Sequence, residues 1–310
     1  NGIVFGFGLN RSGEIGQGQN DDVHFYSTPT KIKLKSGFAV GIATGRNHSL
    51  VLDNGVYSFG QNIFQQLGRD VRVGYVPGEV LMKSAHSEKV EIVEMDAGHT
   101  HSVLLDREGF VWTFGTGTHG YFFFFSCDTH KYTYTHKYSY HTHRQLGLGP
   151  KRSRVGTATR VESLKTKVKQ IAAGSSNTYI VFEDNTIVMF GAKLVSDVPG
   201  EFVRGVFTPH RTIQLESDIE IEGDEKHKDE EDTQVLSVAS GASHTLFVKG
   251  TKMYTYGDNK LGSCGHNHDT ILHRPAILFS CVIPEHTEHF ARVDDSYRLD
   301  YAKIFSGIQN

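Results

Sequence analysis

The sequence predicts an all-β protein, a β-propeller built from four-stranded blades. One observation behind this prediction is a five-residue pattern that occurs five times: an apolar residue, two variable residues, an aromatic residue and glycine. The other is a Gly-x-x-His or Gly-x-x-Asn pattern that precedes each of the last four copies. Two patterns in phase indicate a repeat protein. The first pattern occupies residues 4–8, 56–60, 111–115, 187–191 and 253–257, and the second begins at Gly45, Gly98, Gly174 and Gly241.

The length of the repeat is regular once insertions are set aside. Gly115 and Gly191 close two successive copies of the five-residue pattern, and they are separated by 76 residues. This interval becomes 52 residues, the length of the first interval, when residues 121–144 are left out. We therefore predict one insertion at 121–144 and a second, acidic one at 216–232. Residues 1–310 are interpreted as one propeller-type domain with about five repeat units.

Within each unit, the apolar residues alternate with polar ones, as they do in β-strands with one buried face. In the second unit, strands are expected near 90–95, at 101–106 and at 111–115. Turn-forming residues separate these segments and suit short hairpin loops. A four-stranded sheet cannot cover both its faces alone, and radial packing of several sheets also limits exposed edges. The turns are expected at 53–55, 107–109 and 183–185.

Composition and charge narrow the class of protein. The chain has 33 glycines, 7 prolines and 38% hydrophobic residues, which suits many tight turns around a core. No run of apolar residues is long enough to span a membrane, and no signal peptide is visible. The three cysteines lack metal-binding spacing and fit an intracellular protein, cytoplasmic or nuclear. A net charge of −3 argues against direct binding of nucleic acid.

The repeats resemble those of the regulator of chromosome condensation family. Residues 41–68 follow the family pattern through Gly45-x-x-His48-Ser49, then Gly60, then Gln66-Leu67-Gly68, and residues 97–115 repeat it. The resemblance implies a seven-bladed β-propeller. Because about five units are present here, we expect an incomplete ring. The alternative is a shorter or open ring whose free sheet edge is covered by a partner.

The repeated residues are expected to be structural. A histidine recurs beside a small hydroxyl residue, and we interpret it as a hydrogen-bonded spacer between blades. The glycine before it is expected to supply a backbone conformation that other residues dislike, and the aromatic-Gly pairs are expected to pack blades together. These positions are His48, His101 and His244, with Asn177 in the third unit, and Gly45, Gly60, Gly98, Gly115, Gly174, Gly191, Gly241 and Gly257.

The variable pair inside each Gly-x-x-His turn is the first candidate for partner binding, because function in propellers usually lies on loops. In the family that the repeats resemble, the exchange factors for the Ran GTPase carry acidic residues in some of these loops. None of the pairs here is acidic, and His99 and Ser176 stand where a carboxylate would be expected. The pairs are Arg46-Asn47, His99-Thr100, Ser175-Ser176 and Ala242-Ser243.

The 121–144 insertion is the second candidate. It lies about where the family's exchange factors have a β-wedge, and it begins with an aromatic run that includes Phe122 and Phe123. A tandem repeat follows, and in an extended segment Tyr134 and Tyr140 share one face. His141 and His143 could bind a metal, but a tetrahedral site needs further ligands at fixed spacing. A solvated loop is therefore the preferred interpretation.

No nucleophile elbow, phosphate-binding loop or nucleotide fingerprint is present in the sequence. We expect neither an enzyme nor a cofactor or metal site. The predicted function is a non-catalytic scaffold that presents loops to a protein partner. The alternative is a guanine nucleotide exchange factor for the Ran GTPase that uses 121–144 as a wedge. A metal-binding propeller is the third and weakest hypothesis.

Overall fold

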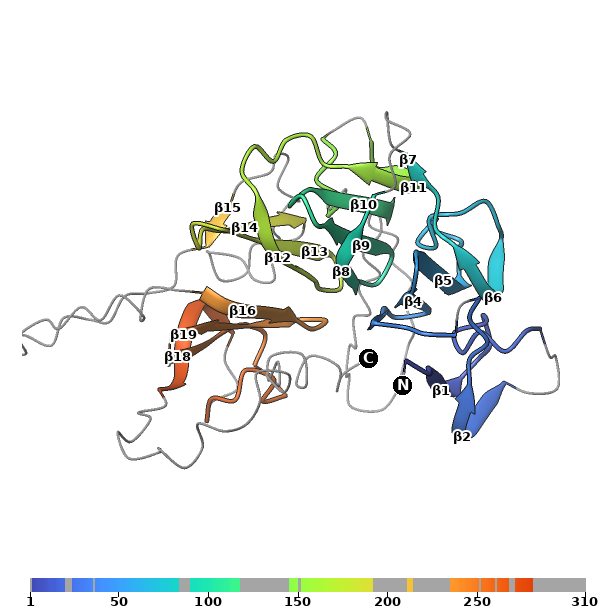
Figure 1. Ribbon diagram of the computed structural model, residues 1–310. Coiled ribbons are helices and arrows are strands. Elements are labelled where there is room, and N and C mark those ends of the chain that lie inside the picture. The colour runs from blue at the N-terminus through green and yellow to red at the C-terminus, as the bar shows by residue number, and fades with distance from the viewer. Residues whose placement is uncertain are drawn as a thin grey trace, which may run out of the picture.

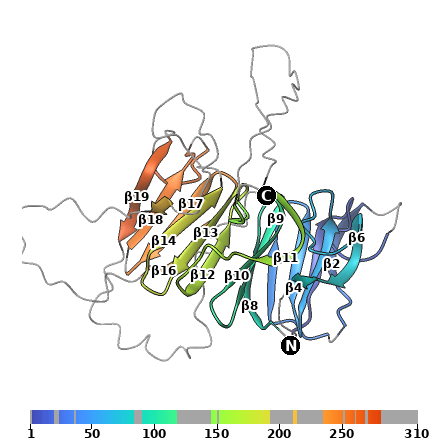
Figure 2. The same ribbon diagram turned by 90° about the horizontal axis from the view of Figure 1, so that it is seen from above.

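The computed structural model describes residues 2–19, 24–35, 37–83, 90–117, 145–149, 152–191, 211–213, 235–250, 252–259, 261–267 and 271–280. Within these ranges the regular secondary structure is β, and the strands form five sheets. The sheets follow one another in chain order around an arc (Figure 1). Seen from above, the sheets pack side by side, each next to the following one (Figure 2). The predicted all-β propeller fold is confirmed, while both predicted insertions lie outside the described residues.

The first sheet, here called the N-terminal sheet, contains β1 (Phe5–Leu9) and β2 (Phe25–Lys31). Each of the other four sheets contains four antiparallel strands, each paired with the next along the chain. We number them as the first to fourth blades. The first blade consists of β3 (Gly41–Thr44), β4 (His48–Leu52), β5 (Val56–Gln61) and β6 (Val73–Glu79), and the second of β8 (Ile92–Ala97), β9 (His101–Asp106), β10 (Val111–Thr116) and β11 (Arg154–Arg160). The third blade consists of β12 (Val168–Ala173), β13 (Asn177–Phe182), β14 (Ile187–Gly191) and β15 (Arg211–Ile213), and the fourth of β16 (Val235–Ser240), β17 (His244–Lys249), β18 (Lys252–Gly257) and β19 (Leu272–Ser280).

The inner strands β8, β12 and β16 lie toward the centre of the arc, and β6, β11, β15 and β19 lie outside (Figure 1). A short strand, β7 (Met82–Lys83), leaves the first blade and pairs in parallel with β11 on the outer edge of the second. The chain thus ties these two blades together along their outer edge.

In each of the four blades the five-residue pattern forms the third strand, and in the N-terminal sheet it forms β1. Its closing glycine has a positive φ, such as 111° at Gly60 and 107° at Gly115, and the strand pairing is irregular there. A Cβ at Gly60 would overlap the carbonyl oxygen of Asn47. Glycine is required at this position for two reasons, because L-residues disfavour that φ and because another turn approaches so closely.

In the four blades, the aromatic residue of the pattern packs against the preceding sheet. Phe59, Phe114 and Phe190 are almost completely buried, and each belongs to a separate apolar cluster between two neighbouring sheets. A Cβ added to Gly68 would lie 2.8 Å from the ring of Phe114, and Gly147 is related to Phe190 in the same way. The core therefore consists of successive apolar layers between blades.

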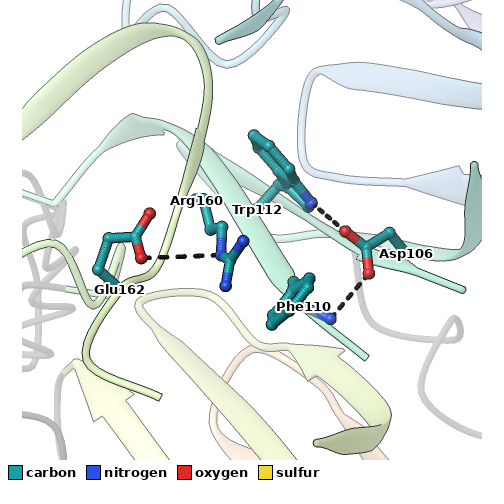
Figure 3. A network of polar contacts seen from close by, with 5 residues as sticks. All are labelled: Asp106, Phe110, Trp112, Arg160 and Glu162. Carbon is teal, nitrogen blue, oxygen red and sulfur yellow. Dashed lines mark hydrogen bonds and ion pairs between the residues drawn. The ribbon is translucent and has the colours of Figure 1, made fainter. Parts of the chain in front are cut away.

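The hairpin at 107–109 shows how local sequence closes a blade. Asp106 is buried, and its carboxylate accepts hydrogen bonds from the backbone N–H of Phe110 at 2.8 Å and from the indole N–H of Trp112 at 2.7 Å. Arg160 lies between Glu162 and Phe110, with its guanidinium 3.4 Å from the centre of the phenyl ring (Figure 3). One carboxylate thus satisfies the turn and a buried indole together.

The apolar side chains of the N-terminal sheet are far more exposed than those of the blades. Phe5, Phe7 and Leu9 are 55%, 66% and 51% exposed. Among the described residues there is no helix that is long and apolar enough to cross a membrane.

Candidate functional site

The four Gly-x-x-His or Gly-x-x-Asn turns join the first and second strands of each blade at one end of the sheets. In every turn the glycine N–H donates to the carbonyl of the fourth residue at 2.9 Å, as from Gly45 to His48 and from Gly98 to His101. The same tight turn is formed at Gly174 and Gly241. The variable pair is therefore presented in one geometry four times.

The histidines lie beneath these turns and link neighbouring blades. His48 Nε2 is 2.8 Å from the hydroxyl of Ser102 in the second blade, and Ser102 donates to the carbonyl of Gln66. Because the serine has one proton and gives it to Gln66, His48 Nε2 must be the donor to Ser102. His101 contacts Thr178 of the third blade at 3.0 Å in the same way.

Burial fixes the charge of these histidines. The pKa of both His48 and His101 is lowered to about 3, mainly by desolvation and, for His48, also by the neighbouring histidines. Desolvation also lowers the pKa of His244. The rings are neutral at physiological pH, so they are poor candidates for acid–base chemistry there.

The reason for the glycine at the start of each turn differs from the one expected. Gly45, Gly98, Gly174 and Gly241 do not have a positive φ, so the expectation of an unusual backbone conformation is wrong. A Cβ at Gly45 or Gly98 would instead overlap the imidazole of the same turn and the backbone of the next blade. The glycine leaves space for the ring, which explains why the two residues occur together.

The third blade replaces this arrangement with two residues. Asn177 stands at the histidine position, and the longer Tyr179 lies two residues further along the same strand face. The Tyr179 hydroxyl accepts from Thr245 of the fourth blade at 3.0 Å and lies 3.4 Å from Asn177 Nδ2. Tyr179 thus reaches the hydroxyl that histidine reaches at the other blade interfaces.

The first members of the variable pairs form a row across three blades. Arg46 Nη1 contacts His99 Nε2, and His99 Nδ1 is 3.2 Å from the Ser175 hydroxyl. Burial, and then the positive charge of Arg46, lowers the pKa of His99 to about 4, so the ring is neutral and its Nε2 accepts a hydrogen bond from the arginine N–H. Arg46 and, in the fourth blade, Ala242 are exposed, while His99 and Ser175 are half-buried.

The second members of the pairs serve mainly the backbone. The carbonyls of Asn47, Thr100 and Ser243 accept hydrogen bonds from the third strand of their own blade, at 2.8, 2.9 and 2.8 Å. Thr100 has no exposed surface, so its expected role in partner contact is wrong. Asn47, Ser176 and Ser243 are half-buried. The candidate face is thus made by Arg46, His99, Ser175 and Ala242.

The sequence prediction missed an asparagine that shapes the loops beside these turns. The side-chain oxygens of Asn10, Asn62 and Asn259 each accept from the backbone N–H five residues later, at 2.9, 2.9 and 2.8 Å. Each asparagine stands two residues after the closing glycine of the five-residue pattern. That fixed offset could have identified it. In the second blade the position is Gly117, next to the long insertion.

Acidic side chains occur on the inner strand β8 rather than in the turns. Asp96 accepts from the backbone N–H of Ala173 at 2.7 Å, and Glu94 accepts from that of Ile171 at 3.2 Å. In the third blade Gln170 contacts Val238 of the fourth blade similarly. These groups join the inner strands of adjacent blades.

The remaining candidate residues, Phe122, Phe123, Tyr134 and Tyr140, lie outside the described residues, as do His141 and His143. The described part of the chain contains no group of three or more His, Cys, Asp or Glu residues arranged to hold a metal ion.

The fold and the recurring turns define the class of this protein as a β-propeller with repeated, sequence-related blades. Residues 1–52 and 53–105 match the regulator of chromosome condensation (RCC1) repeat, so this part of the chain carries two repeats of that type.

Individual proteins resemble this chain over part of its sequence or in its fold. The chain is 38% identical over 121 residues to the probable E3 ubiquitin-protein ligase HERC4 of Mus musculus, covering 38% of this chain and 11% of that protein. Its fold matches human WBSCR16 with a TM-score of 0.69 at 18% identity, covering 89% of this chain and 62% of the other. It matches Prp20p of Saccharomyces cerevisiae with a TM-score of 0.63 at 19% identity, covering 91% and 60%. The chain thus spans less than two thirds of each of these proteins.

Proposed function

We propose that this protein is a non-catalytic scaffold that uses the turn face of its propeller to bind a protein partner. The observation that carries the proposal is the row Arg46–His99–Ser175. These residues vary between repeats, yet they are placed by an invariant turn and connected from blade to blade. Variable side chains on a rigid framework are the usual arrangement of a recognition surface.

The neighbouring structure supports this assignment. The buried histidines beneath the turns hold the blades in register, so the face does not need a partner to become ordered. Protein binding also occurs in the fold: Prp20p was described together with its binding to Gsp1p and histones. That similarity suggests a partner class without identifying the partner of this chain.

Site-specific photo-crosslinking tests the proposal. A photoreactive amino acid at the exposed Arg46 or the half-buried Ser175 samples the turn face. One at Asn54 or Asp184, which are both exposed, samples the opposite ends of the same blades. We expect a discrete protein adduct, competed by excess unlabelled protein, from the first two positions alone. Equal adducts from both ends of the blades would contradict the proposal.

A second function, nucleotide exchange on a small GTPase such as Ran, is favoured by the place of the 121–144 insertion. Gln145, at its C-terminal boundary, donates to the Thr116 carbonyl at 2.8 Å and lies 3.4 Å from the Thr100 hydroxyl. Gly117, before the insertion, donates to Ser153 at 2.6 Å. The insertion is therefore attached to the same face as the Arg46 row.

The two functions differ in their effect on nucleotide release. For an exchange factor, labelled GDP should leave purified Ran faster in the presence of the protein, and deletion of 121–144 should abolish the acceleration. For a scaffold, crosslinking should persist while release stays at its intrinsic rate. Circular dichroism of the deletion variant controls for loss of the fold.

A further inference from the structure

A cavity of about 540 Å³ lies between the first and second blades, beside the turn face. The loop that follows β5 forms one wall, and the start of β11 forms the other. Arg154 in β11 pairs with Thr116, whose N–H bonds to Thr100 in the variable pair. The cavity therefore opens at the same end of the blades as the Arg46 row, further from the centre.

Three arginines line this cavity, together with one carboxylate, Asp70. Among the described residues, the hydrogen-bond partners of Arg69 are neutral oxygens: it donates to the Ser58 hydroxyl at 3.2 Å, the Ser58 carbonyl at 2.9 Å and the Val76 carbonyl at 2.9 Å. Gly74 and Gly78 leave room for its guanidinium, because a Cβ at either position would overlap it. A positive charge is thus built into the wall.

The other two arginines are exposed. Arg154 donates to the carbonyl of Ile63 at 2.7 Å, which joins the two walls. Arg72 makes no hydrogen bond or ion pair with any residue that the structure describes. None of the three arginines forms an ion pair within the described part of the chain. The cavity therefore has an excess of positive charge, although the whole chain has a net charge of −3.

Apolar side chains complete the walls. Ile63, Val71 and Leu81 are 49%, 36% and 50% exposed, and all three line the cavity. Exposed apolar side chains beside fixed charges are typical of a site that takes a segment with both kinds of group. The volume suits a few residues of an extended peptide.

We propose that this cavity binds an acidic peptide of a partner protein, in which carboxylates contact Arg72 and Arg154 and an apolar side chain packs between Ile63 and Leu81. The inference rests on the proposed scaffold function and adds the chemistry of the partner. Guanidinium groups recognise carboxylates by paired, charge-assisted hydrogen bonds.

A partner's peptide is favoured over the chain's own acidic segment, 216–232, by topology. This segment follows β15 and precedes β16. The end of β15 pairs with Ile187, beside the turn at 183–185, so the chain leaves the blade at the end opposite the cavity. The cavity belongs to the first and second blades, whereas the segment connects the third and fourth.

Fluorescence anisotropy tests the proposal with a labelled peptide of alternating acidic and leucine residues, with its Asn/Gln counterpart as the control ligand. We expect the acidic peptide alone to bind, and Arg72→Glu to weaken binding about tenfold or more. Arg11→Glu makes the same change of charge in the corresponding loop of the N-terminal sheet and should leave binding unchanged. Thermal unfolding of both variants shows that the fold is retained.

Other outcomes would overturn the proposal. Equal binding of the two peptides would remove the role of charge, and equal weakening by Arg11→Glu and Arg72→Glu would show only a general field effect. Binding of a phosphopeptide but not of the acidic peptide would assign a different ligand. Self-association lost in Arg72→Glu would assign the site to a second copy. Crosslinking from Arg46 that persists in Arg72→Glu would leave the scaffold function standing.

Discussion

The interface between the second and third blades and the interface between the third and fourth form the same kind of buried hydrogen bond with different side chains. At the former, His101 reaches Thr178 directly; at the latter, Tyr179 supplies the hydroxyl that meets Thr245, because Asn177 is shorter than histidine. Both arrangements bury a hydrogen bond at the same place in the blade. The comparison shows that the repeat conserves the contact between blades rather than the residue, and only the histidine version can be titrated.

Acid should therefore weaken the histidine interfaces most. The folded-state pKa of His48 and His101 is about 3, below the ordinary 6.5, so the unfolded state binds more protons between these values. Stability is complete above about pH 6.5 and falls as the pH decreases, by up to about 1.4 kcal/mol per pH unit for each histidine.

Urea unfolding at pH 7.5 and 5.5 checks this prediction. His101→Gln should lower stability at pH 7.5 and show a smaller further loss at pH 5.5 than the unsubstituted protein. An unchanged pH dependence in this variant would contradict the assignment, since His99 and His244 also have lowered pKa values and would then account for the effect.

Removal of the ring should have the next largest effect. His101→Ala deletes a fully buried side chain and its bond to Thr178, and we expect a loss of about 3 kcal/mol in the free energy of unfolding. His244→Ala is the comparison, because no bond from the His244 ring to a described residue is seen. Chemical denaturation should show a larger loss of stability for His101→Ala than for His244→Ala.

The glycines that accommodate the rings should differ from one another. In Gly98→Ala the new methyl group would meet the His101 ring and the carbonyl of Gly174, which is backbone and cannot move aside easily. In Gly241→Ala its nearest neighbours among the described residues would be atoms of the His244 ring, with Cε1 at 2.7 Å. We expect a loss of about 2 kcal/mol for Gly98→Ala, as for other overpacked sites, and less for Gly241→Ala. Equal melting temperatures would contradict this explanation.

These glycines also show what could be predicted from the sequence. The phase of the two patterns was enough to place the strands of each blade, because a repeated alternation leaves few ways to pair them. The patterns also identified Gly45 and His48 as structural partners. They did not reveal why the glycine is needed, since a positive φ and a lack of space for a Cβ both select glycine at a position.

The candidate site was predicted less completely. Adjacent positions such as His99 and Thr100 look equivalent in a sequence, but the turn leaves the first half-buried and buries the second completely. The cavity lined by Arg72 and Arg154 escaped prediction because its walls are 82 residues apart in sequence and belong to different blades. Only the packing of blades brings them together.

The smallest effect is expected from a single oxygen atom at the third interface. Tyr179→Phe keeps the buried ring, including its edge-to-face contact with Phe247, and removes the hydroxyl that accepts from Thr245 at 3.0 Å and, over a longer distance, from Asn177. We expect a loss of about 1 kcal/mol, the usual net worth of one buried hydrogen bond. Tyr57→Phe is a suitable control, because Tyr57 also lies in a blade strand but takes no part in this contact. A second experiment adds Asn177→His to a Tyr179→Leu variant, which reproduces the His-x-Leu spacing of His48 and Leu50. If the added histidine restores stability, the histidine and tyrosine contacts can replace each other at this interface. If it does not, the third blade differs from the others in more than this pair of residues.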